Sequence, residues 1–213
     1  EKMGYAENCL PKALASFGCE VHVVTSNAQT YFNSPSYKET YEPFLGAGIV
    51  ECGIKQIDGY TLHRLPHDYQ HGLHIQNLTS TFKMLRPQIV QTFDVLSKNT
   101  RESAYYKLHL GFKLFLACHI HASVFPLAKE WQHIRLRTRL GWILRGFAKG
   151  RFVSLLSEKC YPISSDAADI AIRFFGVEPK KISICSLGVD TDIFKPASDL
   201  QSKERRMLAR KEL

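Results

Sequence analysis

Two patterns of hydrophobic and polar residues alternate along this chain. Short, mostly apolar runs rich in β-branched residues predict buried parallel strands at 20–26, 88–93, 113–118, 160–163 and 182–185. Between them, apolar residues recur at helical spacing over 8–18, 75–85, 97–107, 136–147 and 167–175. Strands that alternate with helices are typical of an α/β fold with a mostly parallel sheet flanked by helices.

The pattern also predicts one hairpin and a missing first strand. Asp58-Gly59 lies between two β-type runs, 49–57 and 60–65, which is a hairpin signal. A helix that leads into a parallel strand should itself follow a strand, but the chain begins directly in the loop before the helix at 8–18. We therefore expect a central first strand to be missing. The charged helical tail at 199–213 has no stop signal, so we expect truncation at both ends.

Composition limits the size and the setting of the fold. The chain has 213 residues, of which 45% are hydrophobic, enough for one core and a tail but short of two complete domains. No apolar run reaches the roughly 18 residues that span a bilayer, and no signal segment opens the chain. The six cysteines form no Cys-x-x-Cys pair, which predicts reduced, structural thiols and a cytoplasmic location.

Most of the positive charge is concentrated in one segment. The formal net charge is +8, and residues 129–159 contain eight Lys or Arg against two Glu. An apolar helix stripe runs through this segment, and the cations that lie off it are Arg135, Arg139, Arg145 and Lys149. A solvated helix face and contact with an anionic membrane surface both explain this pattern. Nucleic acid ranks last, because no nucleic-acid motif accompanies the charge, and it is not predicted as a partner.

Two histidines that could belong to a binding site lie at the end of one predicted strand. His119 and His121 directly follow the strand at 113–118, and ligands of α/β sheets bind beyond the carboxyl ends of strands. Either histidine could hydrogen-bond a ligand hydroxyl there, and a hydrogen-bonded structural histidine is the alternative. Residues 4–8 form a Gly-containing loop that opens a helix, where exposed N–H groups favour an anion.

Two other motifs do not support a site. The histidines between 63 and 74 have metal-like spacing, but Pro66 and Gly72 argue against the helix that this spacing requires, so no metal is expected. The sequence at 46–51 lacks the third glycine of a dinucleotide fingerprint and precedes a strand instead of a helix.

Several segments together resemble the N-terminal, acceptor-side domain of retaining glycosyltransferases of family 4, which have the two-domain GT-B fold with Rossmann-like halves. Residues 14–26 resemble the family's Leu-Ala-x-x-Gly-His-Glu-Val run, with Cys19 in place of His. Residues 86–90 read Arg-Pro-Gln-Ile-Val and resemble the Lys/Arg-Pro-Asp-Ile-Val strand. The other matching segments are the first loop at 4–8, the hairpin at 58–66 and the interdomain segment at 186–196.

The resemblance implies an activity that this chain holds only in part. It implies transfer of a hexose from a nucleotide-sugar donor to a saccharide or lipid-linked acceptor with retention of configuration. The acceptor would bind the domain at 1–186, while 187–213 would be a linker and the start of an absent donor-binding domain. No cofactor and no metal are implied, and this fragment alone is expected to be inactive.

The resemblance also assigns residues near the cleft. His119 matches the family's active-site histidine, and His121 is the alternative because the doublet leaves the register open by two. Asp94 would face the acceptor cleft if the strand before it is parallel to its neighbours.

The loop and hinge positions complete this assignment. Gly4 matches the loop that approaches the donor diphosphate, and Glu7 lies in the same loop. Gly188 and Asp190 match the interdomain hinge.

Two alternatives stay open. One is a non-catalytic module that uses its basic helix on an anionic membrane surface. The other is a different GT-B enzyme, such as a sugar-nucleotide epimerase or a sucrose-type synthase. Many members of the resembled family act on lipid-linked acceptors, which adds peripheral contact with the inner membrane face to the cytoplasmic expectation.

Overall fold

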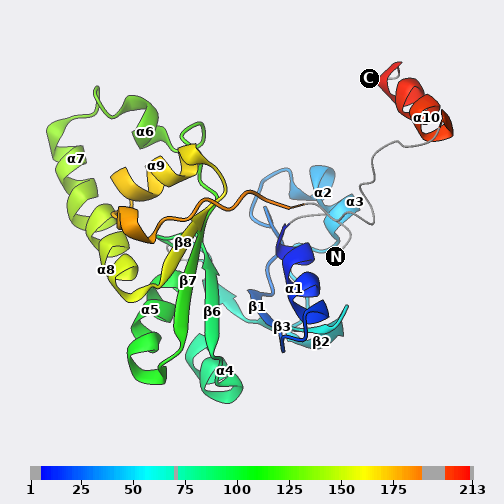
Figure 1. Cartoon of the computed structure of the whole chain (residues 1–213), viewed down its shortest axis with the longest axis horizontal. Helices are drawn as coiled ribbons and strands as arrows, with labels where there is room; N and C mark the ends of the chain where they lie inside the picture. The colour runs from blue at the N-terminus through cyan, green and yellow to red at the C-terminus, as the bar shows by residue number, and fades with distance from the viewer. Residues whose placement is uncertain (1–5, 70–71, 189–199, 212–213) are drawn as a thin grey trace. The chain divides into compact units, whose positions relative to one another are not determined.

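The computed structural model of this chain describes residues 6–69, 72–188 and 200–211 (Figure 1). The chain divides into two compact units. The smaller consists of Glu1–Val21, Asp58–Tyr60 and Leu187–Leu213, and the larger of His22–Ile57 and Thr61–Ser186. Each unit is described by itself.

The described strands form two three-stranded sheets and one two-stranded ladder. The first sheet has the order β1-β3-β2, the second has the order β6-β7-β8, and β4 pairs with β5. The strands are β1 (His22–Ser26), β2 (Gly53–Ile57), β3 (Tyr60–Leu65), β4 (His67–Asp68), β5 (His74–Ile75), β6 (Ile89–Phe93), β7 (Lys113–Cys118) and β8 (Lys159–Pro162). β1 pairs with β3 in parallel, and β6, β7 and β8 are parallel to one another.

The larger unit has its core around the middle strand, β7. Leu114, Leu116 and Cys118 on this strand are fully buried, and Cys160 on β8 is buried beside them. Burying one such aliphatic side chain stabilises a fold by about 1.5–3 kcal/mol. Ala117, which points to the opposite face of β7, is buried as well, so both faces of the strand are covered, as its sequence predicted.

Helices cover the parallel sheet. The described helices of the larger unit are α2 (Tyr37–Thr40), α3 (Glu42–Leu45), α4 (Leu78–Leu85), α5 (Lys98–Leu110), α6 (Pro126–Glu130), α7 (Leu136–Trp142), the π-helical turn η1 (Ile143–Phe147), α8 (Ala148–Leu156), α9 (Ser165–Arg173) and the 3-10 turn η2 (Pro179–Lys181). α5 contacts both α4 and α8, and α9 contacts β7 and β8 (Figure 1). The βαβ pattern predicted from hydrophobic periodicity is therefore confirmed.

Local chemistry explains where the two best-defined helices start. The Ser97 hydroxyl accepts a hydrogen bond from the N–H of Thr100 (3.0 Å) and caps α5. At the far end of α5, Gly111 adopts a φ of 75°, a left-handed conformation that glycine tolerates. The Ser164 hydroxyl caps α9 by accepting from the N–H of Ala167 (3.1 Å).

The smaller unit contains two described helices. They are α1 (Ala6–Ser16) and α10 (Leu200–Lys211). Gly18, with a φ of 84°, follows the end of α1, and Pro11 lies inside this helix instead of in its first turn. The turn at 58–60 has positive φ at both Asp58 (45°) and Gly59 (86°), as the Asp-Gly hairpin signal predicted.

One sequence prediction is wrong, and two others stay predictions. The segment at 182–185 is not a strand, because only one bridge, between Ile182 and Cys160, forms there. β1 and β6 are not paired with each other, and the expected central first strand stays a prediction, as does the domain boundary near 186.

All six cysteines are free, but only two fit the structural role predicted for them. Cys118 and Cys160 are buried, while Cys19, Cys52 and Cys185 are exposed. Burial raises the pKa of Cys118 to about 11 and that of Cys160 to about 12, so both stay as neutral thiols.

Gly150 of α8 gives the first testable prediction. A Cβ built at Gly150 would lie 1.8 Å from the carbonyl oxygen of Phe175, so the backbone would have to move. We expect Gly150→Ala to lower the free energy of unfolding by about 1–3 kcal/mol, as overpacking does. Urea denaturation measures this change.

Gly141 of α7 supplies a matched control. A Cβ there meets nothing within 4 Å, so Gly141→Ala should be neutral or stabilising by up to about 1 kcal/mol through helix propensity. Equal destabilisation by both substitutions would contradict the close approach at Gly150.

Candidate functional site

The carboxyl edge of the parallel sheet brings two predicted site residues to neighbouring strand ends. Phe93 at the end of β6 pairs with Ala117 of β7, so Asp94 and His119 begin the loops after adjacent strands. The N–H of Asp94 donates to the carbonyl of Ala117 (3.1 Å), and the rings of Phe93 and His119 meet edge-on at 5.4 Å. The parallel orientation on which the position of Asp94 depended is therefore present.

The backbone at Asp94 is held in an uncommon conformation. Its φ is 64°, in the left-handed region that non-glycine residues rarely adopt. Its carbonyl accepts hydrogen bonds from the hydroxyl of buried Thr100 (2.8 Å) and from the N–H of Ser97 (3.3 Å). Strained positions of this kind cluster at functional sites when the surrounding structure fixes them.

The second histidine of the doublet is tied to α9. Nδ1 of His121 lies 3.3 Å from the carboxylate of Asp166, which also accepts from the N–H of Ala122 (2.9 Å). Asp166 thus anchors the loop after β7 to the first turn of α9. This pairing supports a structural role for His121, whereas His119 lies at the strand end itself.

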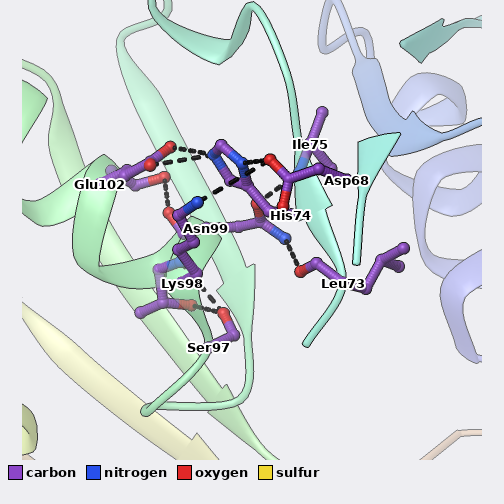
Figure 2. Close-up of polar contacts among 10 residues, drawn as sticks. Asp68, Leu73, His74, Ile75, Ser97, Lys98, Asn99 and Glu102 are labelled. Atoms are coloured by element: carbon purple, nitrogen blue, oxygen red, sulfur yellow. Dashed lines mark hydrogen bonds and ion pairs between the residues drawn. The ribbon is translucent and has the colours of Figure 1, made fainter. Parts of the chain in front are cut away.

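A half-buried histidine network fixes the start of α5 beside this edge. Figure 2 shows the His74 ring between the carboxylates of Asp68 (2.6 Å) and Glu102 (2.9 Å). The amide oxygen of Asn99 accepts from the N–H of Ile75 (2.9 Å), which adds a second tie between β5 and α5. The β4-β5 ladder is thereby joined to the first turns of α5.

The charge of His74 follows from this geometry. Burial by itself would lower the pKa of His74, but the hydrogen bonds to Asp68 and Glu102 outweigh it and raise the pKa above its ordinary value. Protonated His74 donates from both ring nitrogens, which satisfies both carboxylates at once.

The structure places the basic segment in α7, η1 and α8. Its apolar stripe is exposed on the surface, at Leu136, Leu140, Ile143 and Leu144. Two of its four predicted cations, Arg145 and Lys149, line a cavity of about 690 Å³. Both side chains are exposed, so a solvated face and contact with an anionic surface stay open for them, while the opposite face of the helix, with Trp142, packs on the core.

The other two cations have separate roles. Arg139 lies over the ring of Trp131, 5.6 Å from its centroid, and donates to the carbonyl of Gln132. Arg135 occupies the N-cap position of α7 and is exposed.

The loop and hinge positions belong to the smaller unit or lie outside the described residues. Gly4 and Asp190 lie outside the described residues. Glu7 lies in α1 and Gly188 in an exposed loop, and both belong to the smaller unit. A Cβ at Gly188 would meet nothing within 4 Å, so no close approach requires a glycine there.

Sequence reasoning missed two groups of side chains. Arg101 and Arg137 join Arg145 and Lys149 around the cavity, although they come from separate helices. No spacing rule links Arg101 to the others, whereas Arg137 shares a helix face with Arg145 and Lys149 at multiples of four residues, a signal that the sequence did contain. The pairing of His74 with Glu102 was equally invisible, since tertiary contact alone brings the two together.

Comparison with known proteins agrees with the fold. No family model and no curated protein sequence matches the chain. Among solved structures, the chain is similar to HepE (Alr3699) from Anabaena in complex with UDP-glucose, with 14% identity and a TM-score of 0.51. The similarity covers 98% of this chain and 47% of HepE, so the chain spans about half the length of that protein. The architecture is the Rossmann-like α/β half of a GT-B fold.

The described part of the chain contains neither a group of metal ligands nor a membrane-spanning helix. Within residues 6–69, 72–188 and 200–211, no three His, Cys, Asp or Glu side chains are grouped to hold a metal ion. None of the described helices is long and apolar enough to cross a membrane.

The His74 network predicts a pH-dependent stability. A raised pKa in the folded state means that His74 stabilises the fold fully below its unfolded pKa of about 6.5, and that this contribution is lost as pH rises through the folded value. We expect His74→Gln to lower the free energy of unfolding by about 1–2 kcal/mol near pH 6 and by less near pH 9. Denaturant titrations at both pH values measure the difference.

Exposed His133 supplies the control, since no described contact of its side chain depends on charge. His133→Gln should have the same stability as the parent at both pH values. A cost of His74→Gln that grows with pH would contradict the assignment.

Proposed function

We propose that this chain is the acceptor-side half of a GT-B glycosyltransferase that moves a sugar from a nucleotide-sugar donor to a hydroxyl acceptor. The observation that carries the proposal is the fold similarity to HepE, a protein solved with UDP-glucose, over nearly the whole chain. Asp94 and His119 at the carboxyl edge of the sheet support it, because that edge is where α/β folds bind ligands.

The finer description follows the sequence resemblance. We propose retention of configuration, a hexose as the transferred sugar and a saccharide or lipid-linked molecule as the acceptor. The donor nucleotide would bind mainly a second domain, and neither a cofactor nor a metal would be needed. Gly4, Glu7 and the hinge at 188–190 would complete the cleft next to that domain.

The two side chains at the carboxyl edge of the sheet are of types that bind hydroxyl groups. An imidazole at His119 can donate or accept a hydrogen bond, and so can orient a sugar hydroxyl beside the reacting carbon. A carboxylate at Asp94 can accept from an acceptor hydroxyl. The fixed turn at Asp94 holds its backbone in place, which reduces the entropy lost on binding.

The histidine doublet gives the sharpest test of this proposal. In a protein that joins this chain to a donor-binding domain, His119→Asn should lower kcat/KM for sugar transfer by about a hundredfold or more. His121→Asn is the matched control, because His121 is already paired with Asp166 and should keep most of the activity. Steady-state transfer rates decide between the two residues, and full activity of His119→Asn would overturn the assignment.

Contact with a membrane surface is a second candidate function. It is favoured by the exposed stripe of α7 and η1, where Leu136 and Leu144 are 71% and 73% accessible. The pattern matches an amphipathic helix that lies on an anionic bilayer. Leu140→Glu with Leu144→Glu should then reduce co-sedimentation with vesicles that contain phosphatidylglycerol, and unchanged co-sedimentation would refute the contact.

A further inference from the structure

A cation-lined cavity lies between the start of α5 and the helical segment from α6 to α8. Its volume is about 690 Å³, within the range of about 300–1,000 Å³ typical of small-molecule sites. It is lined by Leu96, Arg101, Leu127, Arg137, Thr138, Gly141, Trp142, Arg145, Gly146 and Lys149. We refer to it as the basic cavity.

The charge of the basic cavity is uncompensated. Four of its lining residues are Arg or Lys, and none is Asp or Glu. Among the described residues, no ion pair involves any of these four cations. Like charges that line one cavity repel one another, so an anion bound there would relieve an unfavourable arrangement.

One donor in the basic cavity also lacks a partner. Nε of Arg101 is buried and makes no hydrogen bond within the described structure. A buried donor without an acceptor costs about 1–3 kcal/mol.

The apolar wall of the basic cavity is anchored. The indole N–H of Trp142 donates to the carbonyl of Phe174 (3.0 Å), and its ring contacts Phe125 at 5.3 Å. A Cβ at Gly146 would lie 2.6 Å from the Trp142 ring, so glycine lets the indole lie flat against the helix. Together with Leu96, this wall can contact the organic part of a ligand.

Guanidinium groups favour one kind of anion. Their planar forks match phosphate oxygens with two parallel hydrogen bonds each, and lysine adds a point charge. Three Arg and one Lys around one cavity therefore fit a phosphate or diphosphate better than a single carboxylate.

We propose that the basic cavity binds a phosphate or diphosphate group carried by a larger molecule, held by Arg101, Arg137, Arg145 and Lys149. The group can come from a lipid headgroup or from a soluble phosphate ester, and both share this chemistry. The inference does not depend on glycosyl transfer, because it rests on the lining of the cavity and not on His119 or Asp94.

Titration of this chain with inorganic pyrophosphate tests the proposal. Isothermal titration calorimetry should detect saturable binding that weakens at least tenfold in Arg137→Gln with Arg145→Gln. Both side chains are exposed at the cavity mouth, so the variant should fold, and its circular dichroism spectrum checks this. Arg135→Gln, an exposed cation of α7 that does not line the cavity, should bind pyrophosphate like the parent.

Absence of pyrophosphate binding would overturn the proposal, and so would an equal loss in Arg135→Gln, which would indicate a diffuse basic surface.

A competition experiment, in which a second ligand displaces bound pyrophosphate, identifies the source of the phosphate. Vesicles of phosphatidylcholine with phosphatidic acid that displace pyrophosphate support a lipid headgroup. Displacement by a soluble phosphate monoester, such as glucose 1-phosphate, but not by vesicles supports a free ligand.

Discussion

Parallel pairing of β6, β7 and β8 is the constraint on which the rest of the structure depends. The three strands are held by a fixed register and by the buried side chains of β7, which contact helices on the covered face of the sheet. Because the strands are parallel, their carboxyl ends share one edge, and the loops that carry Asp94 and His119 start side by side there. The placement of the two residues at one edge is a consequence of strand pairing.

Helix positions around this edge depend on small residues and on one aromatic anchor. Trp142, Gly146 and Gly150 are spaced by four along α7, η1 and α8, so they share one helix face. The indole contacts Phe125 and Phe175, and Gly150 permits close approach to the backbone of Phe175. This face points inward, so the leucines of the same segment are left exposed and the basic cavity forms beside the indole.

Much of the fold was predictable from local pattern. The strand at 113–118 and the Asp-Gly hairpin each follow from a few neighbouring residues and are confirmed. The orientation of the helix at 136–147 was not predictable in this way. The spacing of its leucines predicts a helix. Which face of this helix packs inward depends on Trp142 and on the small size of Gly146 and Gly150, and a hydrophobicity pattern does not register that size. Arg101 could not be placed near Arg145 for a similar reason, since only tertiary packing brings their helices together.

We propose that this chain supplies the acceptor side of a nucleotide-sugar-dependent transferase. The most direct measurement is transfer of labelled sugar from UDP-glucose and other nucleotide-sugars, by this chain alone and by a protein that joins it to a donor-binding domain. The account predicts transfer only by the joined protein, because half a cleft binds the donor too weakly to react. Turnover by this chain alone, or a joined protein that neither binds nor consumes any nucleotide-sugar, would contradict it.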